Sequence, residues 1–176
     1  MAKDYPWYKI VESDECLNQG DFVTECPIII PPSEMQEGEE CDVRILNYNV
    51  IIMSQSCDLE NKKIDLVLLC PVWRLADMEQ KSPFFKSSNG KEELRRGNVA
   101  GYHLLNKCEL IGFNEGYQVI DFRNIYSVSL DFLIDLIKKK DKRLRLLPPY
   151  REHLSQAFAR FFMRVGLPVD IPEFKK

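Results

Sequence analysis

The apolar run at Ile64–Val72 is the feature that most constrains what this chain can fold into. Within it, the segment 66–69 contains no polar residue, which predicts a strand that is buried on both faces. Pro71 is expected to end this strand or to lie at its edge, because proline has no N–H to give to a ladder. The run is strand-sized and far shorter than a membrane span, so we expect no membrane partner.

Further strand-like and helix-like patterns surround this run. The expected strands are Phe22–Ile30, Val43–Met53, Gly101–Leu105, Tyr117–Phe122 and Ile125–Val128. Ser129 suits the N-cap of a helix that continues to about Lys139. A last helix follows Pro149, and its residues Leu154, Phe158, Phe161 and Val165 repeat at the spacing of one buried face.

Strands therefore come first and helices later, which is typical of the α+β class. Because Pro and Gly break the short strands, we predict a small, partly open antiparallel β-barrel of SH3-like or PemK-like form, with the C-terminal helices packed on it. A chain of 176 residues fits one domain. We expect a flap at 1–19, a barrel core at 20–128 with a helical insertion near 74–96, docked helices at 129–168 and a tail at 169–176.

The cysteines and the N-terminus bear on compartment and cofactors. The six cysteines include no CxxC pair, and the start of the sequence shows no apolar signal segment, so we expect reduced thiols in a cytoplasm. Only His103 and His153 offer imidazoles, so the sequence predicts no metal site. The usual Gly-rich, nucleotide-binding and hydrolase motifs are missing, and we expect no cofactor.

Charge is unevenly distributed along the chain. Residues 1–88 hold 8 Lys/Arg against 16 Asp/Glu, whereas residues 89–176 hold 16 against 11. The basic excess is concentrated between Lys138 and Arg164, and such a surface suits a polyanion. The alternative is that it complements the acidic half of the same molecule. The candidate phosphate-binding residues are Lys138, Lys139, Lys140, Arg143, Arg145 and Arg164.

Arg160 is interpreted differently because aromatic residues follow it directly. Because Phe161 and Phe162 come directly after Arg160, we do not expect its guanidinium group to be fully solvated. We therefore predict that Arg160 forms a structural ion pair, with Asp121 or Glu152 as its partner.

The segment Ser54-Gln55-Ser56-Cys57-Asp58 follows a strand-like run, where a rigid scaffold commonly presents a functional loop. The candidate catalytic residues are Cys57 and Asp58, with His103 as the base, and Ser54 and Gln55 are candidate binding residues. The same three residues could also form a mixed metal-ligand set, but nothing in their spacing requires it, so the thiol is the preferred interpretation and no metal site is predicted. The structural alternative is a buried cysteine, with Asp58 capping the loop through backbone amides.

Two stretches resemble a known family. Val50–Leu59 contains the SQ-x-CD pattern, and Tyr150–Pro168 contains FARFFMRVGLP. Together they resemble a family of uncharacterised bacterial proteins, over most of the chain from Gly20 to Pro168. This resemblance implies no established function.

The order of strands also resembles the PemK/MazF toxins. Gly20–Val23, Val50–Ser54 and Val67–Pro71 follow the order of those small SH3-like barrels. Those toxins use an Arg after the first strand and a Thr after the proline that ends a later strand. Here no Arg precedes Arg44 in the first connection, and Val72 follows Pro71. The resemblance thus implies the barrel and puts ribonuclease activity in doubt.

The lack of a convergent catalytic set, beside a charge-polarised surface, favours a non-enzymatic binding or accessory module of a bacterial multi-gene system. Its expected partner is a protein or a nucleic acid. The alternative hypothesis is an enzyme, either a divergent PemK/MazF-like endoribonuclease or a thiol enzyme that uses Cys57.

Overall fold

The structure, a computed structural model, describes residues 5–34, 37–38 and 40–163. These residues form ten strands and six helices. In chain order the elements are β1 (Tyr8–Glu12), β2 (Phe22–Ile30), β3 (Arg44–Ile52), α1 (Ser56–Glu60), β4 (Leu66–Arg74), α2 (Leu75–Lys81), α3 (Pro83–Lys86), α4 (Ser88–Arg95), β5 (Tyr102–Leu105), β6 (Cys108–Leu110), β7 (Phe113–Glu115), β8 (Gln118–Asp121), β9 (Tyr126–Ser129), α5 (Leu130–Lys138), β10 (Lys142–Leu146) and α6 (Tyr150–Phe162).

The longest path of hydrogen-bonded strands runs β2-β3-β4-β8-β5, and every pairing in it is antiparallel. The first part of β4 pairs with β9 and its last part pairs with β8, so this strand joins two parts of the sheet. Two further antiparallel ladders are β1 with β10 and β6 with β7. The predicted α+β class is confirmed.

The β1–β10 ladder is tied to the long sheet where β2 begins. Asp21 and Arg145 form an isolated bridge, and the amide of Leu146 donates to the carbonyl oxygen of Gly20 at 2.9 Å. Gly20 has a φ of +85° and lies so close to this strand that an added Cβ would be 3.2 Å from the Cβ of Leu146. A glycine fits this crossing because it tolerates both the positive φ and the close approach.

The two ends of this array of strands approach each other. The hydroxyl of Tyr8 on β1 donates to the carbonyl oxygen of Asn106, just after β5, at 2.6 Å. No ladder joins β1 to β5 or β6 within the part of the chain that the structure describes. A closed barrel is therefore not seen, and the SH3-like barrel stays a prediction.

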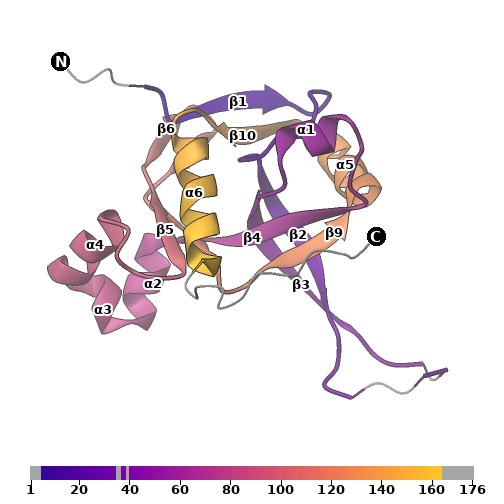
Figure 1. The fold of residues 1–176 in the computed structure, drawn as a ribbon, viewed down its shortest axis with the longest axis horizontal. Helices are drawn as coiled ribbons and strands as arrows, with labels where there is room; N and C mark the ends of the chain where they lie inside the picture. Colours follow the sequence, from indigo (N-terminus) through magenta and orange to yellow (C-terminus); the bar gives the residue numbers. More distant parts are fainter. Residues whose placement is uncertain (1–4, 35–36, 39, 164–176) are drawn as a thin grey trace, which may run out of the picture.

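Helices cover the sheet at three places (Figure 1). Leu154 of α6 packs in one core cluster with Phe122, and Leu133 and Ile137 of α5 pack in a second. The short helices α2, α3 and α4 lie to one side, where Leu94 contributes to a third cluster. The far ends of β2 and β3 project from this body as a long hairpin (Figure 1).

The central strand β4 differs from its prediction. Leu66 and Leu68 are 58% and 41% exposed, while Val67 and Leu69 are fully buried. The prediction of burial on both faces is therefore wrong for this half of β4, because only one of its faces meets the core. Pro71 does not end the strand either, since β4 continues through it to Arg74.

The two C-terminal helices form where the sequence predicts them. The Oγ of Ser129 caps α5 by accepting from the amide of Phe132 at 3.3 Å. In α6, Leu154 is fully buried, and Phe158 and Phe161 are partly buried against the same core cluster. Val165, the last member of that stripe, lies outside the described residues. Among the described helices, none has the length and apolar character needed to span a bilayer.

Candidate functional site

The Ser54–Asp58 segment is bound into the fold by its serine side chains. The Oγ of Ser54 accepts from the amide of Leu68 at 2.9 Å, and the Oγ of Ser56 accepts from the amide of Gln19 at 3.1 Å. The side chain of Gln19 also donates to the carbonyl oxygen of Met53 at 2.7 Å. Ser54 is buried, so it is held by the sheet and does not present its hydroxyl to a ligand.

Cys57 does not lie beside His103, the residue predicted to act as its base. It is exposed on the one-turn helix α1, after the exposed Gln55, and its Sγ lies 3.7 Å from Oδ1 of Asp58. His103 is on β5, which Figure 1 shows well away from α1 across the sheet. The predicted arrangement of Cys57, Asp58 and His103 is therefore not formed. Among the described residues, no group of three or more His, Cys, Asp or Glu side chains is placed to hold a metal ion.

Arg143 and Arg145 lie inside the protein and do not belong to an exposed basic face. Both are on β10, and both bind the carboxylate of the fully buried Asp21. Arg143 uses Nε at 2.7 Å, and Arg145 uses Nε and, at 2.9 Å, Nη2. Arg143 also donates to the carbonyl oxygens of Glu12 and Glu15 at 2.7 and 2.8 Å. The prediction that these arginines bind phosphate is wrong, because their N–H groups already donate to the carboxylate of Asp21 and to backbone carbonyl oxygens at the end of β1 and after it.

The three lysines of the predicted basic surface lie at the end of α5. Lys138 is exposed and lies 3.5 Å from the equally exposed carboxylate of Asp135. Lys139 is exposed, whereas Lys140 is partly buried and lines a small cavity. Arg164 lies outside the described residues, so its predicted role stays a prediction.

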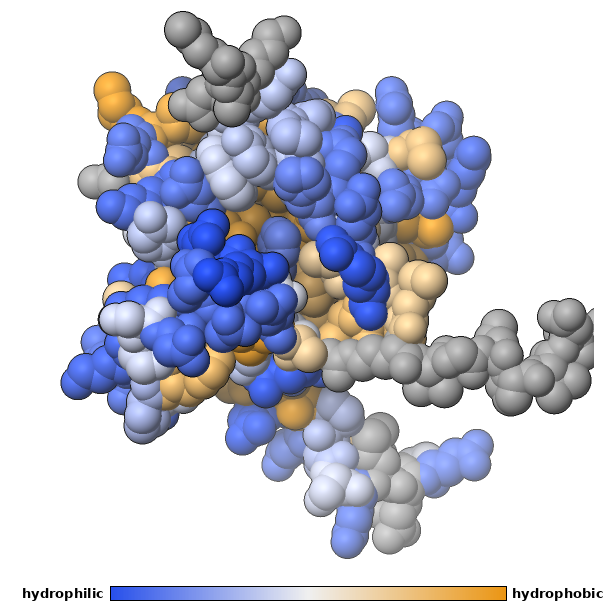
Figure 2. Space-filling view, turned by 60° about the vertical axis from the view of Figure 1, so that its left-hand side comes forward, coloured by the Kyte–Doolittle hydropathy of each residue, from blue (hydrophilic) through white to orange (hydrophobic). Residues whose placement is uncertain are grey.

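A larger cleft, of about 520 Å³, lies between the segment 94–104 and α6. Its lining includes the basic side chains of Arg95, Arg96, His103, His153 and Arg160. No Asp or Glu is among the described residues that line it. Figure 2 shows this side of the molecule, where a hollow with a hydrophobic floor has strongly hydrophilic side chains on both rims.

Gly101 shapes the floor of this cleft at the start of β5. Its φ is +86°, and an added Cβ would lie 2.7 Å from Cγ of Arg123 and 3.2 Å from Cε2 of Phe161. Its carbonyl oxygen accepts from the amide of Phe122 at 2.8 Å. A side chain at position 101 would displace α6 or Arg123, so the cleft requires glycine here.

His103 is the deepest of the basic groups. Its ring stacks on that of Phe122, with centroids 6.2 Å apart and planes at 19°. Burial, with smaller contributions from the charges of His153 and Arg160, lowers the pKa of His103 from 6.5 to about 4. The imidazole is therefore neutral near pH 7 and can either donate or accept a hydrogen bond.

Arg160 is exposed at the cleft, contrary to its prediction. Its Nε donates to the carbonyl oxygen of Gln156, one helical turn earlier, at 3.3 Å. The expected partners are used elsewhere: Asp121 binds Arg123 at 2.9 Å, and Glu152 binds Arg151 at 2.7 Å. The prediction of a structural ion pair is wrong. No carboxylate lies within 4.0 Å of Arg160 in the part of the chain described.

Arg95 and Arg96 share one carboxylate on the other side of the cleft. Nε of Arg95 lies 2.7 Å and Nε of Arg96 lies 2.8 Å from oxygens of Glu92. Hydrogen bonds, first from Arg95 and then from Arg96, lower the pKa of Glu92 to about 2. A second carboxylate, that of Glu93, accepts from Nδ2 of Asn98 in the same lining at 2.9 Å, so the two guanidinium groups are accompanied by two carboxylates on this side of the cleft.

The arrangement suits an anion that also carries an apolar or aromatic part. Among the described residues, Arg160 offers an unpaired guanidinium from one side, Arg95 and Arg96 offer their remaining N–H donors from the other, and Phe122 provides an apolar floor. Sequence reasoning missed most of this site. The helical spacing of His153, Gln156 and Arg160, at i, i+3 and i+7, was the available signal, because it places all three on one face beside the apolar stripe.

Comparisons with known proteins give no relative to guide the assignment. No protein-family model matches this chain, and no curated protein and no solved structure matches it. What the cleft binds is therefore inferred from its own geometry and charge.

Proposed function

We propose that this chain is a binding module that holds single-stranded nucleic acid in the cleft between residues 94–104 and α6. One observation carries the proposal: the charged side chains that line the cleft are all basic. Arginine recognises phosphate through paired N–H donors, and a cleft without carboxylates concentrates phosphate.

The dimensions of the cleft support a single strand over a duplex. Its volume of about 520 Å³ falls within the range of roughly 300–1,000 Å³ that is usual for small-ligand sites. A nucleotide fits such a space, whereas a duplex does not enter it. Tyr102 and Phe161 line the same cleft, and aromatic rings are the common stacking partners of unpaired bases.

A partly open barrel is part of the same proposal. The bridge between Asp21 and Arg145 connects β10 to β2, and the hydrogen bond from Tyr8 to Asn106 brings β1 to the end of β5. These two links support a sheet that curves around the core beneath α6. A curved sheet of this kind is a rigid base for the loop 97–101, which forms one wall of the cleft.

Fluorescence anisotropy with labelled single-stranded RNA and DNA, measured over a salt series, tests the proposal. If about three phosphates are neutralised, the logarithm of affinity should fall with the logarithm of salt concentration with a slope of roughly −2. Arg160→Ala should weaken binding and make this slope shallower by about 0.7, because one phosphate contact is lost. Gln156→Ala should fold equally well and lose less affinity.

A double variant at the end of α5, Lys138→Ala with Lys139→Ala, is the matched control. It removes two exposed charges but leaves the cleft intact, so its binding should equal that of the wild type. If this control loses affinity while Arg160→Ala does not, the basic end of α5 is the binding surface and the cleft is not. Lack of binding at low salt would exclude nucleic acid and favour an acidic protein partner.

A ribonuclease is the second candidate, favoured by the two imidazoles in this cleft. His103 and His153 both line it, and His153 contributes to the lowered pKa of His103. A neutral imidazole can act as a general base, and a second one can act as the acid. Incubation of the protein with total RNA decides the matter: cleavage that His103→Gln and His153→Gln abolish would establish the enzyme, and intact RNA would leave the binding module.

A further inference from the structure

Strand β5 ends the longest path of paired strands, so one of its edges has no neighbouring strand in the described part of the chain. The amide of Phe122 donates to the carbonyl oxygen of Gly101 at 2.8 Å, directly before the ladder that pairs β5 with β8. The direction of hydrogen bonding alternates from residue to residue along an antiparallel strand. The main-chain groups of residues 101, 103 and 105 therefore face β8, and those of Tyr102 and Leu104 face the free edge.

This free edge lies in the larger cleft. Tyr102 and Leu104 are both partly exposed, and both line the cleft. The amide of Tyr102 donates to the carbonyl oxygen of Val99 at 3.2 Å, and the carbonyl oxygen of Asn106 accepts from the hydroxyl of Tyr8. Between these two bonds, three outward-facing groups have no partner among the residues that the structure describes: the carbonyl oxygen of Tyr102, and the N–H and carbonyl oxygen of Leu104.

The three groups form a fixed series of acceptor, donor and acceptor. Their complement is a ligand edge that presents a donor, an acceptor and a second donor. Among the nucleobases, the Watson–Crick edge of adenine comes closest, because it presents the N6 amino group, the N1 nitrogen and the weakly donating C2–H. Uracil presents acceptor, donor and acceptor, so it places like against like at every position. Cytosine matches two of the three groups, and guanine matches one.

We propose that the free edge of β5 binds the Watson–Crick edge of an unpaired adenine. The N6 amino group donates to the carbonyl oxygen of Tyr102, N1 accepts from the N–H of Leu104, and C2–H meets the carbonyl oxygen of Leu104. The base lies between Val99 on one wall of the cleft and Ala157 of α6 on the other, and its phosphate reaches Arg160. The assignment of adenine rests on the proposed function and gives its substrate class, which is single strands that contain adenine.

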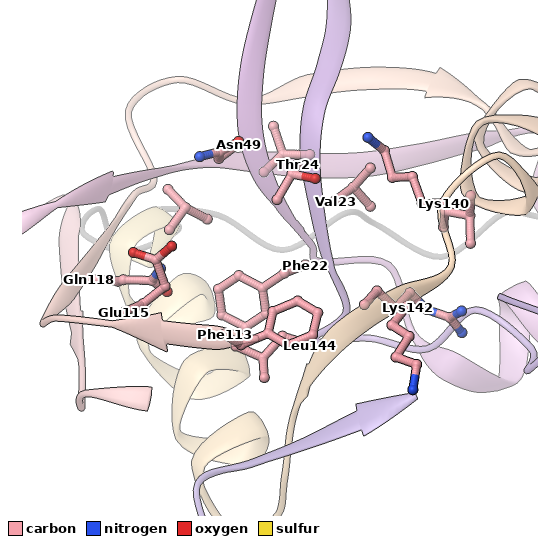
Figure 3. A pocket seen from close by; sticks show the side chains of 14 residues that line it. Phe22, Val23, Thr24, Asn49, Phe113, Glu115, Gln118, Lys140, Lys142 and Leu144 are labelled. Carbon is pink, nitrogen blue, oxygen red and sulfur yellow. The ribbon is translucent and has the colours of Figure 1, made fainter. Parts of the chain in front are cut away.

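A smaller cavity with aromatic rings in its wall does not offer a base an alternative site. It lies beside β2, β7 and the start of β10, where the rings of Phe22 and Phe113 lie close to Leu144 (Figure 3). Its volume of about 70 Å³ is too small for a purine. It shares no lining residue with the larger cleft, so Val23 and Val50, which line it, are reference positions for a binding experiment.

Fluorescence anisotropy with labelled hexanucleotides and the full chain tests the proposal. The adenine hexamer should bind about tenfold more tightly than the uracil hexamer, because uracil leaves all three main-chain groups unsatisfied. In methyl NMR spectra, the adenine hexamer should shift the signals of Val99 and Leu104 and leave those of Val23 and Val50 in place.

Two modified bases form the matched pair. 1-Deazaadenine lacks N1, whereas 7-deazaadenine loses a nitrogen but keeps the whole Watson–Crick edge. The 1-deaza hexamer should therefore bind about tenfold more weakly than the 7-deaza hexamer. 2,6-Diaminopurine adds an amino donor at C2 and should bind at least as tightly as adenine.

Variants identify the groups that recognise the base. Leu104→Pro removes the central donor, and an outward-facing position of an edge strand tolerates proline. It should abolish the preference for the 7-deaza over the 1-deaza hexamer. Leu104→Ala is the matched control, because it shortens the same side chain but keeps the N–H, and it should keep the preference. Arg160→Ala should weaken both hexamers by the same factor, and Gln156→Ala should leave the preference unchanged.

The outcomes separate recognition of the base from binding of the strand. If the hexamers bind but the 1-deaza form binds as tightly as the 7-deaza form, or if Gln156→Ala abolishes the preference, main-chain recognition of adenine is overturned and the proposed function stands. If no hexamer binds at low salt, both are overturned. If Leu104→Pro does not fold, the deaza pair still decides, because it requires only the wild-type protein.

Discussion

The ring of Phe158 on α6 packs edge-on against the ring of Phe122, with centroids 5.3 Å apart and planes at 78°. Phe122 follows β8 and is almost fully buried, and it also stacks on His103. The same phenylalanine therefore supports the docked helix and the imidazole at the floor of the cleft. Changes that loosen α6 should also affect the cleft.

Phe158→Ala should lower the free energy of unfolding by about 2–4 kcal/mol. Because the ring of Phe158 is only partly buried, this loss is at or below the loss that is usual for a core phenylalanine. Chemical denaturation followed by circular dichroism measures this change. Phe162→Ala is the control, because Phe162 is on the same helix and is 56% exposed. Equal, small effects of both substitutions would show that α6 is not docked through Phe158.

Asp21→Ala should destabilise the protein by about 3–5 kcal/mol, because it leaves Arg143 and Arg145 buried without their anion. The exposed pair of Asp135 and Lys138 provides the comparison, and Asp135→Ala should change stability by about 0.5 kcal/mol or less. Urea denaturation of the two variants beside the wild type measures both. A mild effect at Asp21 would mean that water replaces its carboxylate.

Stability should fall between pH 6.5 and pH 4 because of His103. The folded protein lowers the pKa of this imidazole from 6.5 to about 4, so folding disfavours its protonated form. Its contribution to stability is fully present above pH 6.5 and is lost as the pH falls to about 4, by on the order of 3 kcal/mol at most. Urea denaturation at several pH values should show a flatter profile for His103→Gln, whereas parallel profiles would contradict this origin.

The six free cysteines should separate into two classes on alkylation. Cys16, Cys41 and Cys57 are exposed, and Cys26, Cys70 and Cys108 are buried. Burial raises the pKa of Cys26 to about 11 and that of Cys70 to about 12, so their reactive thiolates are scarce. Mass spectrometry after brief iodoacetamide treatment should find three modified sites in the native protein and six in urea. Early modification of Cys70 would contradict the packing of β4.

The two C-terminal helices were predictable because their signals are local. The cap at Ser129 and the spacing of Leu154 and Phe158 are contained within a few residues each, and the structure has both. Strand β10 was not predictable in this way. Arg143 and Arg145 indicated an exposed basic run, and only Asp21, more than a hundred residues earlier, explains why they are buried.

The candidate site was missed for a related reason. His103 belongs to a strand-like pattern, Arg95 and Arg96 to the predicted helical insertion, and Arg160 to the last helix, so no local motif joins them. They meet only because α4, β5 and α6 converge. The Cys57 hypothesis rested on a segment whose serine side chains have a structural role, because they accept hydrogen bonds from the amides of Gln19 and Leu68.

The pairing of β1 with β10 sets an order on folding during synthesis. Residues 8–12 are made early, but their ladder partners at 142–146 are made about 130 residues later. A nascent chain therefore carries an unpaired first strand, and the arginines that neutralise Asp21 are still missing. The sheet can be completed only after β10 leaves the ribosome, and such long-range pairing is typical of slow folding. Until then the first strand is a segment for chaperones to shield.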